Sequence, residues 1–129
     1  MRLLLDTHYA AWVAVAPERL SSKELELLQD NEVIASAISI WELRIKWPIL
    51  DRRGNRKGPA DPRSVLEGLS ALEIEMFALT AAHAAATLER PIAHNDPFDQ
   101  ALLIHAQELD AKLLTRDREL ARHPLAITA

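Results

Sequence analysis

Short apolar runs without polar alternation are the clearest pattern along the chain. They occupy residues 2–5, 33–36 and 112–115, and each predicts a strand buried on both faces, as in the middle of a parallel sheet. Residues 72–76 instead alternate strictly between apolar and polar side chains, which favours a half-exposed edge strand. Residues 125–127 are expected to close the chain as a short last strand. Together these segments predict one mainly parallel sheet.

Helix signals separate the predicted strands. The S-x-x-E spacing of residues 21–24 predicts a capping box at the start of a helix. Asp61 and Asp96 are each followed by a proline, which predicts an N-cap with proline at the first helical position. Further helices are predicted over residues 7–15 and from Thr80 to Pro91. The alternation of strands and helices predicts the α/β class.

Composition limits the architecture and the function classes. A chain of 129 residues with 49% hydrophobic and 26% charged residues predicts a single globular domain over residues 1–129. The absence of cysteine excludes disulfides and thiolate zinc sites. No apolar run approaches the roughly 20 residues of a membrane span, and the N-terminus lacks a secretory pattern, so we expect a cytoplasmic protein. The net charge of −4 argues against a non-specific polyanion binder but leaves a local basic patch open.

Acidic side chains follow the ends of the predicted strands. Asp6 stands directly after the first strand, Glu42 lies in the helix after the second, and Asp117 lies just beyond the 112–115 strand. Asp99 falls in the first turn of a helix entered from a loop. In an open α/β sheet the ligand pocket forms outside the carboxyl ends of the strands. We therefore expect these four carboxylates to converge on one edge of the sheet.

Each acid taken alone also has a structural explanation. Asp6 would serve as the N-cap of the first helix. Ser39 and Glu42 have the spacing of a capping box, and Glu42 with Lys46 makes a favourable i,i+4 ion pair. Asp99 near a helix N-terminus is favoured by the helix dipole. These local explanations do not account for the occurrence of all four acids at one predicted edge of the sheet.

A cluster of carboxylates favours a divalent metal site. Packed carboxylates repel one another unless protons or cations neutralise them. Mg²⁺ prefers oxygen ligands, keeps several waters and binds through a few carboxylates together with substrate phosphates. Such a site predicts phosphodiester chemistry, in which bound ions activate a water and stabilise charge on the phosphate.

The segment 44–57 has a local excess of five positive charges. Proline, glycine and asparagine predict that its second half is a loop, and Trp47 adds an aromatic face. A basic, flexible segment with an aromatic ring is suited to hold a nucleic-acid backbone or an acidic partner segment. It also fits an ordinary solvated loop. The candidate contact residues are Arg44, Arg52, Arg53, Arg56 and Lys57.

Four ordered motifs together resemble those of PIN-domain proteins, specifically VapC-like ribonuclease toxins of prokaryotic toxin–antitoxin pairs. The resemblance extends over nearly the whole chain. The motifs are Leu4-Leu5-Asp6-Thr7-His8, Ser36-x-x-Ser39-x-Trp41-Glu42-Leu43, His94-x-Asp96-Pro97-Phe98-Asp99 and Leu113-Leu114-Thr115-x-Asp117.

The resemblance implies a PIN fold, a three-layer α/β/α sandwich around the sheet. It also implies Mg²⁺- or Mn²⁺-dependent endoribonuclease activity, homodimers and a cognate antitoxin that covers the acidic site. Gln100 is a departure, because many relatives have arginine there, and this puts substrate or partner contacts in doubt more than metal binding. Matched by motif, the acidic quartet is Asp6, Glu42, Asp99 and Asp117, with Asp96, Ser39 and Thr115 as auxiliary residues.

Two other function classes remain as alternatives. A PIN-like binding module would keep the fold and the acids without turnover. A phospho-acceptor signalling domain is also an α/β domain with an acidic metal pocket, but it needs an acceptor aspartate after a middle strand and a lysine after a late one. The second strand ends in Ser36, and Lys112 precedes its strand, so neither group is where that domain requires it.

Overall fold

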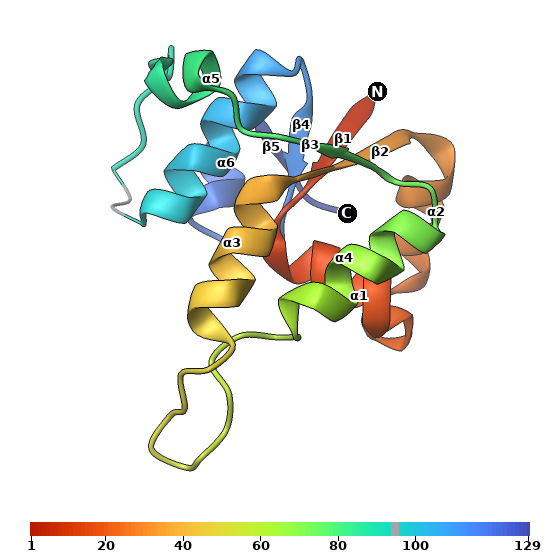
Figure 1. The fold of residues 1–129 in the computed structure, drawn as a ribbon. Helices are drawn as coiled ribbons and strands as arrows, with labels where there is room; N and C mark the ends of the chain where they lie inside the picture. The colour runs from red at the N-terminus through yellow and green to blue at the C-terminus, as the bar shows by residue number, and fades with distance from the viewer. Residues whose placement is uncertain (94–95) are drawn as a thin grey trace.

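The carboxyl ends of the described strands meet at one edge of the sheet, because the pairs that these strands form are parallel. The computed structural model describes residues 1–93 and 96–129. In that part of the chain the sheet has the order β3-β2-β1-β4-β5, with β1 at its centre (Figure 1). The strands are β1 (Arg2–Leu5), β2 (Glu32–Ser36), β3 (Glu75–Phe77), β4 (Lys112–Leu114) and β5 (Ala126–Ile127).

Helices cover both faces of the sheet (Figure 1). Successive strand residues point to opposite faces, so Leu5 and Leu114 pack with α1 and α4 in one core, whereas Leu4 and Leu113 pack with α6 in the other. This confirms the predicted α/β class and three-layer arrangement. The helices are α1 (Thr7–Val15), α2 (Ser22–Asp30), α3 (Ala37–Lys46), α4 (Pro62–Ala71), α5 (Ala81–Ala85) and α6 (Pro97–Glu108).

Most of the predicted helix starts are confirmed. Ser21 and Glu24 form a complete capping box at α2. Asp61 and Asp96 cap α4 and α6, each with proline in the first turn. Thr80 caps α5 as expected. None of the helices in residues 1–93 and 96–129 is both long and apolar enough to cross a membrane.

Two predicted boundaries are wrong. The edge strand β3 starts at Glu75 rather than at residue 72, because Glu73 has a positive φ of 59° in the turn that follows α4. The helix that Thr80 opens ends at Ala85, well before Pro91. No residue of α5 is buried, so tertiary packing does little to extend this alanine-rich helix.

Helices α1 and α4 approach each other closely at Gly68. A Cβ atom on Gly68 would lie 2.6 Å from the carbonyl oxygen of Ala14 and 2.8 Å from its Cβ. Glycine is therefore required by the contact rather than by the backbone conformation. This packing fixes α1, whose first residue follows Asp6.

We expect Gly68→Ala to destabilise the protein by roughly 1–3 kcal/mol, because overpacking at Ala14 outweighs the gain of about 1 kcal/mol from alanine in a helix. Ser70→Ala, at an exposed position of the same helix, should leave stability unchanged or slightly higher. Chemical denaturation of the three proteins measures both effects. A more stable Gly68→Ala variant would contradict the close approach.

Candidate acidic active site

The ends of β1 and β4 place three polar side chains side by side. Leu5 and Leu114 are register partners, and the Asp6 amide donates to the Leu114 carbonyl at 3.1 Å. Asp6 is 8% exposed and caps α1, with Oδ1 accepting from the Tyr9 amide at 2.9 Å. The buried Thr115 hydroxyl accepts from the amide of Asp117 at 3.0 Å. The centre of the sheet therefore presents two of the four predicted acids.

Glu42 enters the site from α3 and not as part of a capping box. Ser36 is the N-cap of α3, so the predicted cap at Ser39 is wrong, because the helix begins at Ala37, three residues earlier than a cap at Ser39 would place it. Glu42 is 6% exposed; it accepts from Thr7 Oγ1 at 2.6 Å and from Lys46 Nζ at 2.5 Å. The predicted ion pair is thus confirmed. The buried Ser39 hydroxyl lies 3.2 Å from Thr7 Oγ1 and so helps to orient this threonine.

The N-terminus of α6 brings two further acids. Asp96 caps the helix, with Oδ1 accepting from the amides of Phe98 at 2.8 Å and Asp99 at 3.2 Å. Asp99 lies in the first turn. His94, which belongs to the third sequence motif, lies outside the described residues.

Asp117 is held by the backbone that follows it. Its Oδ1 accepts from the amides of Glu119 at 2.8 Å and Leu120 at 3.1 Å, at the start of the 3₁₀ helix Leu120–Arg122. Asp117 is exposed, in contrast to Asp6 and Glu42.

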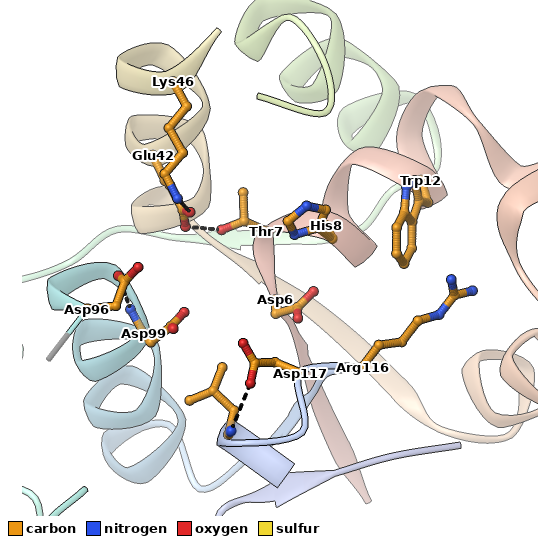
Figure 2. A pocket seen from close by; sticks show the side chains of 11 residues that line it. Asp6, Thr7, His8, Trp12, Glu42, Lys46, Asp96, Asp99, Arg116 and Asp117 are labelled. Atoms are coloured by element: carbon orange, nitrogen blue, oxygen red, sulfur yellow. Dashed lines mark hydrogen bonds and ion pairs between the residues drawn. The ribbon is translucent and has the colours of Figure 1, made fainter. Parts of the chain in front are cut away.

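These acids surround one cavity of about 370 Å³ (Figure 2). The structure therefore brings the four predicted carboxylates and Asp96 together. Ser39 and Thr115 do not line the cavity but contact residues that do. In the described part of the chain, no three histidine, aspartate or glutamate side chains stand close enough to hold a metal ion. The lining residues are Asp6, Thr7, His8, Trp12, Glu42, Lys46, Asp96, Asp99, Arg116, Asp117 and Leu120.

Burial and charge shift the titration of the groups in this cavity. Burial raises the pKa of Asp6; hydrogen bonds from Tyr9 and Thr115 oppose this rise, and the charge of Glu42 adds to it. Burial alone would lower the pKa of Lys46, but its hydrogen bond to Glu42 and the nearby acidic charges raise it overall. The ammonium of Lys46 thus relieves part of the repulsion among the carboxylates.

The sequence did not predict that two cations, Lys46 and Arg116, and the aromatic ring of Trp12 line the cavity. It identified Lys46 as the ion-pair partner of Glu42 but not as a cavity residue. Arg116 and Trp12 lie on the opposite side from Lys46 (Figure 2). The position of Arg116 directly before Asp117 was the only available signal, and α1 offered none for Trp12.

The predicted basic contact residues lie apart from the cavity. They belong to the end of α3 and to the loop that projects beyond it (Figure 1). The loop is closed by an antiparallel bridge between Leu50 and Arg56. Arg56 donates to the Trp47 carbonyl at 2.9 Å, and its guanidinium lies 4.3 Å from the centroid of the Trp47 ring. The described side chains that line the cavity do not include Arg44, Arg52, Arg53, Arg56 or Lys57.

Comparison with known proteins identifies the family of this chain and a relative of similar length. The family model for the PIN domain matches residues 3–125. Ribonuclease VapC22 of Mycobacterium tuberculosis is 29% identical over 131 residues, which cover 98% of this chain and 96% of that protein.

Two solved structures share the fold. One is VapBC2 from Rickettsia felis bound to a DNA fragment from their promoter, with a TM-score of 0.60, 16% identity and coverage of 100% of this chain and 98% of that one. The other is FitAcB from Neisseria gonorrhoeae, with a TM-score of 0.51, 21% identity and coverage of 98% and 95%.

We expect Asp6→Asn to raise the melting temperature of the metal-free protein at pH 7 by roughly 2–5 °C. Because the pKa of Asp6 is raised in the native state, the stability that its proton contributes at low pH is lost as pH rises through that value. Asparagine keeps the N-cap acceptor without the buried charge. The gain should shrink as the pH falls.

Melting curves in chelator across pH test this expectation. Asp61→Asn is the matched control, since Asp61 caps α4 outside the cavity and should change stability little. An Asp6→Asn variant that melts below the wild type at pH 7 would show that the charge of Asp6 is not a burden on the fold.

Proposed function

The chain belongs to the PIN-domain family and is a homologue of VapC-like ribonuclease toxins, and from this premise we propose that it is a metal-dependent endoribonuclease. We further propose that it is the toxin of a prokaryotic toxin–antitoxin pair, that residues 1–129 act as a single domain, and that it works in the cytoplasm. The observation that carries the proposal is the group of five carboxylates around one cavity at the carboxyl edge of the sheet.

The donor chemistry of the cavity fits a hard divalent cation. Its acids offer only carboxylate oxygens, the ligands that Mg²⁺ and Mn²⁺ prefer. The charge of Glu42 adds to the rise in the pKa of Asp6, so these carboxylates repel each other, and a bound cation would relieve that repulsion. We propose that Asp6, Glu42, Asp99 and Asp117 hold the ion, with Asp96 as an auxiliary acid.

The residues around the proposed metal ion have different roles. When bound, Mg²⁺ or Mn²⁺ supplies Lewis-acid stabilisation of the phosphate and lowers the pKa of a water. Thr7 orients the Glu42 carboxylate through its 2.6 Å hydrogen bond. Lys46 and Arg116, on opposite sides of the cavity, offer positive charge to phosphate oxygens (Figure 2). The chain has no cysteine, and the described lining residues include no serine. We assign the Thr7 hydroxyl to orienting Glu42 rather than to covalent attack.

Partners follow from the relatives and from the charge of the surface. We propose an RNA substrate, because the relative VapC22 is a ribonuclease, and a cognate antitoxin, because the structural neighbours are VapBC2 and FitAcB. The proposed homodimer follows from the resemblance of the motifs to VapC-like toxins. The projecting basic loop provides positive charge outside the acidic cavity, where an RNA backbone or an acidic partner segment would bind. Gln100 lies in the first turns of α6 beside the cavity acids, where an arginine would add a further cation.

One observation favours the second candidate, a PIN-like binding module without turnover. Lys46 already neutralises Glu42 at 2.5 Å, and the described acids are not gathered around a single point. The cleavage experiment separates the two functions. A phospho-acceptor domain has no support from the family match.

We expect Asp6→Asn and Glu42→Gln each to lower RNA cleavage in Mn²⁺ by roughly a hundredfold or more, because each removes charge from the centre of the proposed metal site. Asp61→Asn should retain wild-type cleavage. Gel analysis of structured and single-stranded RNA measures the rates. If the wild type cuts neither RNA and Glu42→Gln behaves identically, the protein is a binding module rather than a nuclease.

Removing the positive charges of the projecting loop should weaken RNA binding and flatten its dependence on salt, because fewer counterions are released from the RNA. The loop variant replaces four residues by glutamine: Arg52, Arg53, Arg56 and Lys57. The matched control removes four positive charges elsewhere, at Lys23, Arg63, Arg90 and Arg122, and should keep the wild-type slope. The measurement is the dissociation constant at several salt concentrations. Equal slopes for the loop variant and the wild type would remove the loop from RNA binding.

A further inference from the structure

A second hollow adjoins the acidic cavity on the side of α1. Its volume is about 200 Å³, and it lies between one face of α1 and Pro59, at the end of the projecting loop. His8 and Trp12 line both the hollow and the acidic cavity. Trp12 is therefore the wall between a small, mainly apolar space and the carboxylates.

Arg116 fixes the wall from the side of the acidic cavity. Its guanidinium carbon lies 4.2 Å from the centroid of the Trp12 ring. Its Nε and Nη2 donate to the two Glu24 oxygens at 2.7 and 2.5 Å, and Nη2 also donates to the Arg19 carbonyl at 2.8 Å. Three hydrogen bonds and the contact with Trp12 thus hold a cation whose side chain is still 46% exposed.

Glu24, the ion-pair partner of Arg116, is itself held in place. Glu24 is 4% exposed and also accepts from the Tyr9 hydroxyl and from the Ser21 amide at 2.7 Å. The hydrogen bond from Arg116 lowers the pKa of Glu24 to about 2, so Glu24 stays ionised at any physiological pH. Breaking such a charged hydrogen bond is costly, which keeps the guanidinium against Trp12.

We propose that the hollow receives a nucleobase of the RNA strand, next to the phosphate that is cut, with Trp12 as its stacking surface. This inference rests on the proposed ribonuclease function and adds a specificity-determining residue to it. Aromatic rings bind single-stranded bases by stacking, and Arg116 is placed to contact the phosphate on the cavity side. A strand that crosses Trp12 would put its base in the hollow and its backbone over the carboxylates.

Charge favours a nucleotide over an apolar protein side chain in this hollow. Arg19 lines the hollow and Arg116 lines the cavity, so each of the two spaces that share Trp12 has a cation in its lining. Such a pair suits the phosphates on either side of one nucleotide. A protein segment that only buried an apolar side chain would not need either charge.

The test removes the base and the ring separately. The substrate is a single-stranded RNA whose cut site has been mapped with the wild type, with an abasic ribonucleotide placed in turn at each of three positions on either side of the cut. Specificity constants are measured in Mn²⁺ for the wild type, Trp12→Leu, Trp12→Phe and Trp41→Leu. Trp41 is the control, because it is an exposed tryptophan beside Arg44 and outside both cavities.

We expect the wild type and Trp41→Leu to lose roughly tenfold to a hundredfold at one position when its base is removed, as stacking energies predict. Trp12→Leu should already be slower on intact RNA and should lose less than about twofold at that position. Trp12→Phe should fall between them. An equal gain in melting temperature on adding Mn²⁺ for Trp12→Leu and the wild type would show that the acidic cavity is intact.

A full abasic penalty in Trp12→Leu would overturn the proposal, and so would a wild type that loses nothing at any position. If Trp12→Leu does not fold, Trp12→Met, which also lacks a ring, takes its place, and a full abasic penalty in that variant overturns the proposal. Unchanged RNA cleavage in both Trp12 variants would likewise overturn it. A wild type that cleaves no RNA would remove the proposed function itself, which is a distinguishable result.

Discussion

Repulsion among five carboxylates at one cavity is the constraint on which the site depends. The fold meets it by anchoring the acids to backbone amides and side-chain donors. Asp6, Asp96 and Asp117 each accept from amides at the start of a helical segment, where the backbone carries partial positive charge. The helix-cap and active-site explanations of these acids are therefore not alternatives, since the caps hold the carboxylates in place.

Parallel topology makes this arrangement possible. With every strand running the same way, each following helix begins at the same edge of the sheet, and polar residues at strand ends become neighbours there. Asp6 and Thr115 follow strands that pair directly, in register at Leu5 and Leu114. This is why apolar runs in the sequence were sufficient to predict both the sheet and the edge at which the acids meet.

Local signals predicted the fold well, and long-range contacts account for what they missed. The caps at Asp61 and Asp96 depend on neighbouring residues alone and were predicted correctly. Ser39 has the spacing of a cap, but Ser36 takes that role and Ser39 packs against Thr7, far away in sequence. Arg116 meets Trp12 and Glu24 only through the tertiary fold, so no spacing in the sequence predicts it.

The placement of positive charge separates the proposed metal binding from the proposed RNA binding. Five carboxylates and two cations line the cavity, so its excess of acidic groups favours cations and opposes an RNA backbone. Phosphate affinity must then come from charges that are fixed or remote. Lys46 and Arg116 are fixed by their ion pairs to Glu42 and Glu24, and the projecting basic loop is remote. If loop charges sat in the cavity they would pair with the acids, so their distance from it preserves both the proposed metal site and the proposed grip on RNA.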